Sequence, residues 1–116
     1  MTEKDCLFCK IIRGEIPSDK VYENDLIYAF RDIAPAAPEH ILIIPKKHIA
    51  SLNDIETEDK MLFGEIMYRA SVLAKELGFS EQGYRTVANT LDHGGQTVHH
   101  FHLHLIAGRQ MTWPPG

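Results

Sequence analysis

The residues best suited to chemistry are histidines, four of which follow one another closely near the C-terminus of a chain that has seven. His100, His102 and His104 alternate with the apolar residues Phe101 and Leu103. On a β-strand, residues two apart share one face and lie roughly 6.5–7 Å apart along the chain. We therefore predict a row of three imidazoles on one face of a strand, with apolar side chains on the opposite face.

Two kinds of catalysis use such a row. Alternating imidazoles bind a catalytic metal when a third ligand completes the set. Alternatively, one imidazole acts as a nucleophile while its neighbours orient it and bind an anion. A metal hydrolase usually adds a carboxylate beside its histidines, and no aspartate or glutamate follows His93. The Gly-Gly-Gln-Thr stretch at 94–97 offers backbone N–H groups and a hydroxyl to an anion, so the sequence favours a nucleophilic histidine.

The elements that must position these residues alternate in type along the chain. Periodicity and turn residues predict loops at 33–38 and 92–96 and strands at 21–22, 26–31, 40–45, 84–89 and 98–106. A long helix is predicted over 58–77, with Thr57 as its N-cap and Gly78 just past its end. Its apolar stripe comprises Leu62, Ile66, Met67, Ala70, Leu73, Ala74 and Leu77. Strands, a helix and further strands predict an α+β domain with a mainly antiparallel sheet.

The composition is that of one globular domain over residues 1–116, with 44% hydrophobic and 24% charged residues in 13.2 kDa. A net charge of −4 and a pI near 5.9 lack the basic excess of proteins that bind nucleic acid or anionic membranes. No apolar stretch approaches the ~20 residues of a spanning helix, and the charged start is unlike a signal peptide. We expect a cytoplasmic protein without nucleic-acid or membrane partners.

Residues 89–106 (Asn-Thr-Leu-Asp-His-Gly-Gly-Gln-Thr-Val-His-His-Phe-His-Leu-His-Leu-Ile) resemble the signature of the histidine triad (HIT) superfamily. Residues 30–48 and the ending at 108–116 resemble its Hint branch. The resemblance extends from about Leu7 to Gly116. It implies a HIT-like fold with an antiparallel sheet of about five strands and one long helix, and a homodimer that pairs through that helix and adjacent strands.

The resemblance also implies a reaction and the residues that perform it. Members of this branch cleave the P–N bond of purine nucleoside 5′-phosphoramidates through a nucleotidyl-histidine intermediate, releasing AMP or GMP and an amine. His102 would be the nucleophile, and His104 would donate a hydrogen bond to phosphate oxygens. His100 and His40 would hold the imidazoles in their working tautomers, and Thr97 would serve the leaving amine. Catalysis would require no cofactor.

Purine nucleotides, namely AMP, GMP and their phosphoramidate derivatives, are the implied ligands. Asp32 would take the two ribose hydroxyls, and the phosphate would lie against Asn89 and the backbone of Gly95, Gln96 and Thr97. A purine needs flat apolar walls, which the resemblance assigns to Leu7, Phe8, Ile11, Phe30, Ile33 and Leu42.

Cys6 and Cys9 form a C-x-x-C pair, the second constellation in the sequence. In a reducing compartment such thiols are free, redox-active or metal-bound rather than a structural disulfide. Some HIT relatives bind a structural zinc with this pair, a histidine at the position of His48, and the first triad histidine, here His100. The resemblance therefore implies a zinc site, with two unmetallated thiols as the alternative. His93 and His99 receive no role.

Two alternative functions stay open beside the phosphoramidase. One is hydrolysis of dinucleoside polyphosphates, as in enzymes of the Fhit type. The other is a regulatory module that binds nucleotides without catalysis. The complete triad disfavours the module, because a binding protein needs no aligned nucleophile. The short chain and the Hint-like ending favour the phosphoramidase over the polyphosphate hydrolase.

Overall fold

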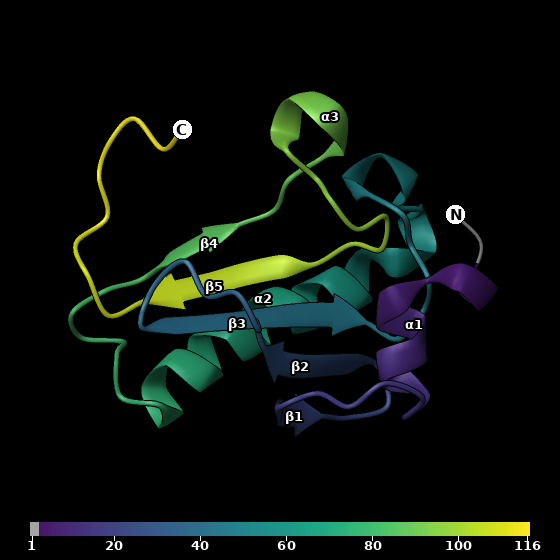
Figure 1. Cartoon of the computed structure of the whole chain (residues 1–116), viewed down its shortest axis with the longest axis horizontal. Coiled ribbons are helices and arrows are strands. Elements are labelled where there is room, and N and C mark those ends of the chain that lie inside the picture. The colour runs from purple at the N-terminus through teal and green to yellow at the C-terminus, as the bar shows by residue number, and fades with distance from the viewer. Residues whose placement is uncertain (1–2) are drawn as a thin grey trace.

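A five-stranded antiparallel sheet is the centre of the computed structural model, which describes residues 3–116 (Figure 1). The strand order is β1-β2-β3-β5-β4. The strands are β1 (Lys20–Glu23), β2 (Ile27–Arg31), β3 (Glu39–Pro45), β4 (Arg85–Val87) and β5 (Leu103–Ala107). The predicted α+β fold, with about five antiparallel strands and one long helix, is confirmed. Residues 1 and 2 of the predicted single domain lie outside the described residues.

The two faces of the sheet are covered by different helices. The long helix α2 (Lys60–Glu76) lies behind the strands in Figure 1, and the short helix α1 (Leu7–Ile12) lies in front of them at one end. On β3, Ile41 and Ile43 belong to the core beneath α2, whereas Leu42 and Ile44 belong to the core beside α1. This alternation follows from the two-residue period of a strand. The continuous apolar run of β3 is explained by burial on both faces.

The helix α2 buries one stripe of small and branched side chains, namely Ile66, Ala70, Leu73 and Ala74. Met67 was expected to widen this stripe, and that prediction is wrong, because its side chain is 52% exposed. Consecutive helical residues point about 100° apart around the axis, so the neighbour of Ile66 faces away from the sheet. Leu77 lies just past the last helical residue and is also exposed.

The ends of α2 agree with the predicted sequence signals at one end only. After Leu77, Gly78 has a φ of +87°, and the amide of Phe79 donates to the carbonyl of Ala74 at 3.0 Å. This is the Schellman pattern, in which a glycine past the helix accepts the left-handed conformation. At the start, Thr57 is not the N-cap, because a 3₁₀ turn (Thr57–Asp59) precedes the helix and Asp59 takes the N-cap position.

Several predicted boundaries near the C-terminal half are wrong. The strand expected at 84–89 spans only Arg85–Val87, and the strand expected at 98–106 is β5 at Leu103–Ala107. The loop expected at 92–96 overlaps a one-turn helix, α3 (Leu91–Gly94). The loop at 33–38 is confirmed. A turn follows β1, and in it the side-chain oxygen of Asn24 accepts the amide of Ile27 at 3.0 Å.

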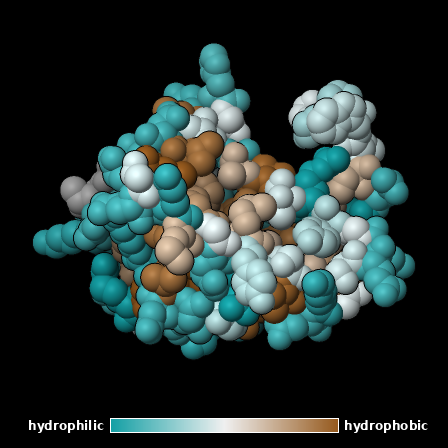
Figure 2. All heavy atoms as spheres, turned by 180° about the vertical axis from the view of Figure 1, so that it is seen from behind, coloured by the Kyte–Doolittle hydropathy of each residue, from teal (hydrophilic) through white to brown (hydrophobic). Residues whose placement is uncertain are grey.

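The outer face of the molecule shows hydrophobic side chains among hydrophilic ones (Figure 2). On α2 the exposed apolar residues are Met61, Met67 and Tyr68. The expected homodimer would pair through this helix, and it stays a prediction. Among residues 3–116, no helix is long and apolar enough to cross a membrane.

Candidate active site

The histidine row lies partly ahead of the strand that was expected to carry it. β5 begins at Leu103, so His100 and His102 precede it. Their alternation is nevertheless kept, because Phe101 is buried with Leu103 in the core beneath α2. The amide of Phe101 donates to the carbonyl of Ile49 at 2.6 Å, which pins this segment to the loop after β3. A single backbone bond thus replaces the ladder that the sequence pattern predicted.

The protonation of His102 is set by a neighbouring carbonyl. Its Nδ1 lies 2.8 Å from the carbonyl oxygen of His100, and because a carbonyl only accepts, the proton must be on Nδ1. Burial lowers the pKa of His102, which favours the neutral ring. A neutral imidazole with its proton on Nδ1 keeps a free lone pair on Nε2. His102 therefore has the electronic form of a nucleophile.

His100 is completely buried and is fixed in the opposite tautomer. Its Nε2 donates to the carbonyl of Pro45 at 2.8 Å, which leaves a lone pair on Nδ1. Burial lowers its pKa to about 4, so the ring is neutral at pH 7. The residue thus contributes its backbone carbonyl to His102 while its ring faces the two cysteines.

His40 and His104 form a hydrogen-bonded pair whose protons can also be assigned. The backbone amide of Ala36 donates to Nδ1 of His40 at 2.9 Å, so the proton of the neutral His40 ring is on Nε2. That Nε2 lies 2.9 Å from Nδ1 of His104 and donates to it. His104 consequently carries its own proton on Nε2. Burial lowers the pKa of His40, and burial together with His102 and His40 lowers the pKa of His104 to about 4.

The Nε2 proton of His104 has no partner among the described residues. Nearly all buried polar groups in proteins are hydrogen-bonded, and an exception usually indicates a functional role. The ring of His104 lies 4.9 Å from that of His102, centroid to centroid, and both residues line the same pocket. A free lone pair on His102 and an unpartnered N–H on His104 therefore lie on neighbouring rings at one pocket.

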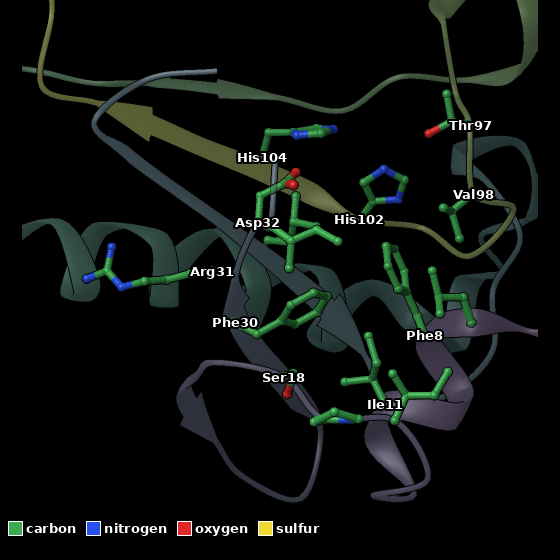
Figure 3. A pocket seen from close by; sticks show the side chains of 15 residues that line it. Phe8, Ile11, Ser18, Phe30, Arg31, Asp32, Thr97, Val98, His102 and His104 are labelled. Atoms are coloured by element: carbon green, nitrogen blue, oxygen red, sulfur yellow. The ribbon is translucent and has the colours of Figure 1, made fainter. Parts of the chain in front are cut away.

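The pocket that these histidines enter has a volume of about 270 Å³ and combines a polar end with apolar walls (Figure 3). Phe30 pairs across the sheet with Leu42, and Leu42 pairs with His104. The apolar wall therefore continues directly into the histidine row. Phe8 of α1 packs edge-on against Phe30 and against His102, at centroid distances of 5.5 and 5.2 Å.

Of the predicted nucleotide-binding residues, most line this pocket. They are Leu7, Phe8, Ile11, Phe30, Asp32, Ile33, Leu42, Thr97, His102 and His104. Ile33 is at the rim, because its side chain is 99% exposed. One oxygen of Asp32 accepts the amide of Ala34 at 2.8 Å, and the other lies 3.5 Å from Nε2 of His40. The carboxylate still offers lone pairs to a ligand.

Asn89, Gly95 and Gln96 do not line the pocket. The side chain of Gln96 is buried, and its polar atoms are hydrogen-bonded to the main chain of its own loop and of the loop after β3. Its Nε2 donates to the carbonyls of Ala50 and Val98 at 2.7 and 3.0 Å, and its Oε1 accepts the amide of Leu91 at 2.9 Å. Gln96 therefore holds the loop before the triad in place, and phosphate binding by this stretch stays a prediction.

Some pocket residues were missed from the sequence, namely Ile16, Pro17, Ser18, Arg31 and Val98. Of these, Arg31 and Val98 were within predicted strands, and the guanidinium of Arg31 is paired with Glu39 at 2.6 Å. The alternation of side chains along β2 would have placed Arg31 on the face of the sheet that Phe30 does not occupy, away from the pocket. Residues 16–18 form a loop in which no periodicity indicates a side-chain direction.

Beneath the triad, four side chains form a cluster with the donor set of a zinc site. Nδ1 of His100 lies 3.3 Å from Sγ of Cys6 and 3.5 Å from Sγ of Cys9. Nδ1 of His48 lies 3.3 Å from Sγ of Cys9 and 3.2 Å from Nδ1 of His100. Tetrahedral zinc holds such atoms about 3.3–3.8 Å apart. The four residues predicted as ligands therefore come together in a geometry that fits zinc.

Comparison with known proteins identifies the family. Residues 13–111 match the HIT domain family. The chain is 53% identical over 113 residues to an uncharacterized HIT-like protein of Synechococcus elongatus, covering 97% of this chain and 98% of that one. It is 49% identical over 108 residues to the purine nucleoside phosphoramidase of Escherichia coli, covering 93% and 91%.

A solved structure agrees with these relatives. The crystal structure of a HIT family hydrolase from Legionella pneumophila superposes with a TM-score of 0.95 at 59% identity, covering 97% of this chain and all of that one. Together with the alternating histidines and the pocket above them, these matches show that the chain belongs to the HIT family.

Proposed function

We propose that this protein hydrolyses the P–N bond of purine nucleoside 5′-phosphoramidates and that His102 is the nucleophile. The supporting observation is the pair of assigned ring protons. Nε2 of His102 has a free lone pair, and Nε2 of His104 has a buried N–H without a partner. An electrophilic group that carries anionic oxygens would use both atoms at once, and a nucleotide phosphoryl group is such a group. The similarity to the Escherichia coli phosphoramidase supports the same reaction.

In the first step, the lone pair on Nε2 of His102 attacks phosphorus, and the P–N bond to the amine breaks. The amine leaves with the bonding electrons and takes a proton from solvent, relayed by the hydroxyl of Thr97, which lines the pocket. The positive charge that develops on the His102 ring is stabilised by its Nδ1–H bond to the carbonyl of His100. The N–H of His104 donates to a phosphoryl oxygen.

In the second step, a water molecule attacks phosphorus and the bond to His102 breaks, so the electron pair returns to Nε2. The nucleoside monophosphate is released, and the water protons pass to solvent. The sum is one phosphoramidate and one water converted into one monophosphate and one amine. The apolar walls around Phe8 and Phe30 would hold the base, and the free lone pairs of Asp32 would accept the ribose hydroxyls.

The substrate class is tested by measuring AMP release from adenosine 5′-phosphoramidate and, separately, from a diadenosine polyphosphate. We expect turnover of the phosphoramidate and little release from the polyphosphate. Release without enzyme, measured in parallel, is the control. Turnover of the polyphosphate alone would favour an enzyme of the Fhit type. Tight AMP binding without turnover of either substrate would indicate a regulatory module.

We also propose that Cys6, Cys9, His48 and His100 hold a structural zinc ion. The support is the convergence of two thiols and two imidazole nitrogens within 4.8 Å of one another. The carbonyl of Pro45 fixes His100 with its Nδ1 lone pair toward the thiols, which is the tautomer that a metal ligand needs. Bound zinc would crosslink α1 to the segment before β5.

Elemental analysis tests the zinc proposal. Purified protein should contain about one zinc per chain, and the Cys6→Ser, Cys9→Ser double variant should contain almost none, because structural zinc affinity depends on the thiolates. Exposed His93 provides a matched control, since His93→Ala leaves the cluster intact. A zinc content below about 0.2 per chain, unchanged after incubation with zinc, would contradict the proposal.

A further inference from the structure

The end of the pocket farthest from the histidines holds one hydroxyl pair. Figure 3 shows Ser18 on the opposite side of the pocket from Thr97 and His104, with Phe8 and Phe30 between them. Oγ of Ser18 lies 2.7 Å from the hydroxyl of Tyr28. The aromatic ring of Tyr28 packs beside Phe30 at 5.9 Å, so this hydroxyl pair adjoins the apolar wall.

The β2 strand sets the distance between this pair and the polar end. Tyr28, Phe30 and Asp32 follow one another at two-residue steps, and each step covers roughly 6.5–7 Å along an extended chain. A nucleoside whose ribose is bound at Asp32 and whose base lies on Phe30 would therefore point the far edge of the base toward Tyr28. Ser18 lines the pocket there, whereas Tyr28 stands behind it.

We propose that Oγ of Ser18 hydrogen-bonds the far edge of a purine base and that Ser18 thereby determines specificity for purines over pyrimidines. Tyr28 acts as a positioning residue, because its hydroxyl fixes Oγ of Ser18. This inference rests on the proposed function, since it assigns the base of that substrate to this end of the pocket. Ile16, Pro17 and Ser18 are consecutive in the chain and line the pocket, and Ser18 is the polar one of the three.

The chemistry of two paired hydroxyls suits either purine. One hydroxyl proton is used in the Ser18–Tyr28 bond, and the other proton and several lone pairs remain. If Tyr28 donates, Ser18 can donate to a ring nitrogen or to the carbonyl of guanine. If Ser18 donates, its lone pairs can accept the amino group of adenine. A pyrimidine attached through its single ring is shorter and leaves Ser18 without a partner.

The experiment compares Ser18→Ala with wild type for binding of AMP and UMP, and for turnover of adenosine and uridine 5′-phosphoramidates. Removing one neutral hydrogen bond should weaken AMP binding and raise the KM of the adenosine substrate by about 3- to 10-fold. The kcat should change little, because Ser18 is far from phosphorus. Binding of UMP and turnover of the uridine substrate should be unchanged.

Tyr28→Phe provides a second variant, since it keeps the ring and removes only the partner hydroxyl. It should shift the AMP-to-UMP ratio in the same direction by a smaller factor, and Ser18→Thr should restore the ratio toward wild type. Equal losses for AMP and UMP in Ser18→Ala would show a merely structural role and overturn the inference alone. Wild-type protein that binds neither nucleotide would overturn the proposed function, and the inference with it.

Discussion

Replacing His102 by alanine should lower kcat for the adenosine phosphoramidate by about 10⁴-fold or more, because loss of a nucleophile removes the whole covalent route. Nε2 of His102 bears the free lone pair in the pocket, and the other imidazoles have theirs engaged. His100 turns its lone pair to the cysteines, and His104 accepts from His40. No neighbouring ring can therefore take over the attack. Steady-state AMP release and AMP binding by calorimetry are the measurements.

Three further measurements distinguish loss of the nucleophile from a general loss of structure or of a metal. AMP should still bind to the His102→Ala variant, because the apolar walls and Asp32 remain. The matched control His93→Ala, on the exposed one-turn helix α3, should keep wild-type turnover. Treatment of folded wild-type protein with EDTA should not stop turnover, since no step requires a metal. More than a tenth of wild-type activity in His102→Ala, or loss of activity in EDTA without unfolding, would contradict the nucleophile assignment.

Replacing His104 by alanine is the second large effect, and it should be smaller. It removes the one buried side-chain N–H that has no partner within the described chain. Loss of a single preorganised donor to a developing anion typically lowers kcat by about 10²–10³-fold. Because the nucleophile remains, the covalent intermediate still forms slowly. The KM should change less than kcat, since the donor is used most strongly when charge develops on the phosphoryl oxygens.

His104→Gln is the informative companion variant. A glutamine amide also presents an N–H donor to the pocket, although its other end accepts from His40 less well. Its single-turnover rate should lie between the rates of His104→Ala and of the wild type. A glutamine variant no better than alanine would indicate that the ring, and not its N–H, is what His104 contributes. Full activity of His104→Ala would refute the phosphoryl-donor role.

The long, strongly patterned elements were predictable from the sequence. A continuous apolar run predicts the core strand β3, and an apolar stripe at helical spacing predicts the helix α2. The helix α1 was missed, because six residues are too few to show a period. It is stabilised by its contacts instead, with Phe8 and Ile11 buried against Phe30 and Leu42. Tertiary packing, which local sequence does not contain, decides such short helices.

The candidate site also has a part that local sequence predicts and a part that depends on tertiary contacts. The histidine row was predictable, since alternation alone places three imidazoles on one face. The ring protons were not, because they depend on contacts that form only in the folded chain, namely those of His100 with the carbonyl of Pro45 and of His104 with His40. Ser18 was also out of reach, because it lies in a loop without periodicity. Its position becomes meaningful only through the 2.7 Å contact with Tyr28.

The tautomers of the histidines are fixed by main-chain atoms: one amide and two carbonyls. Replacing the side chain at position 36 or 45 therefore leaves these hydrogen bonds in place, because every amino acid supplies a backbone carbonyl and all except proline supply a backbone N–H. The protonation pattern of these rings thus depends on the path of the backbone and not on the side chains at positions 36 and 45. Proline at position 36 is the exception, because it lacks the backbone N–H that donates to Nδ1 of His40. Without that bond, the His40 proton would no longer be held on Nε2, where it is donated to His104.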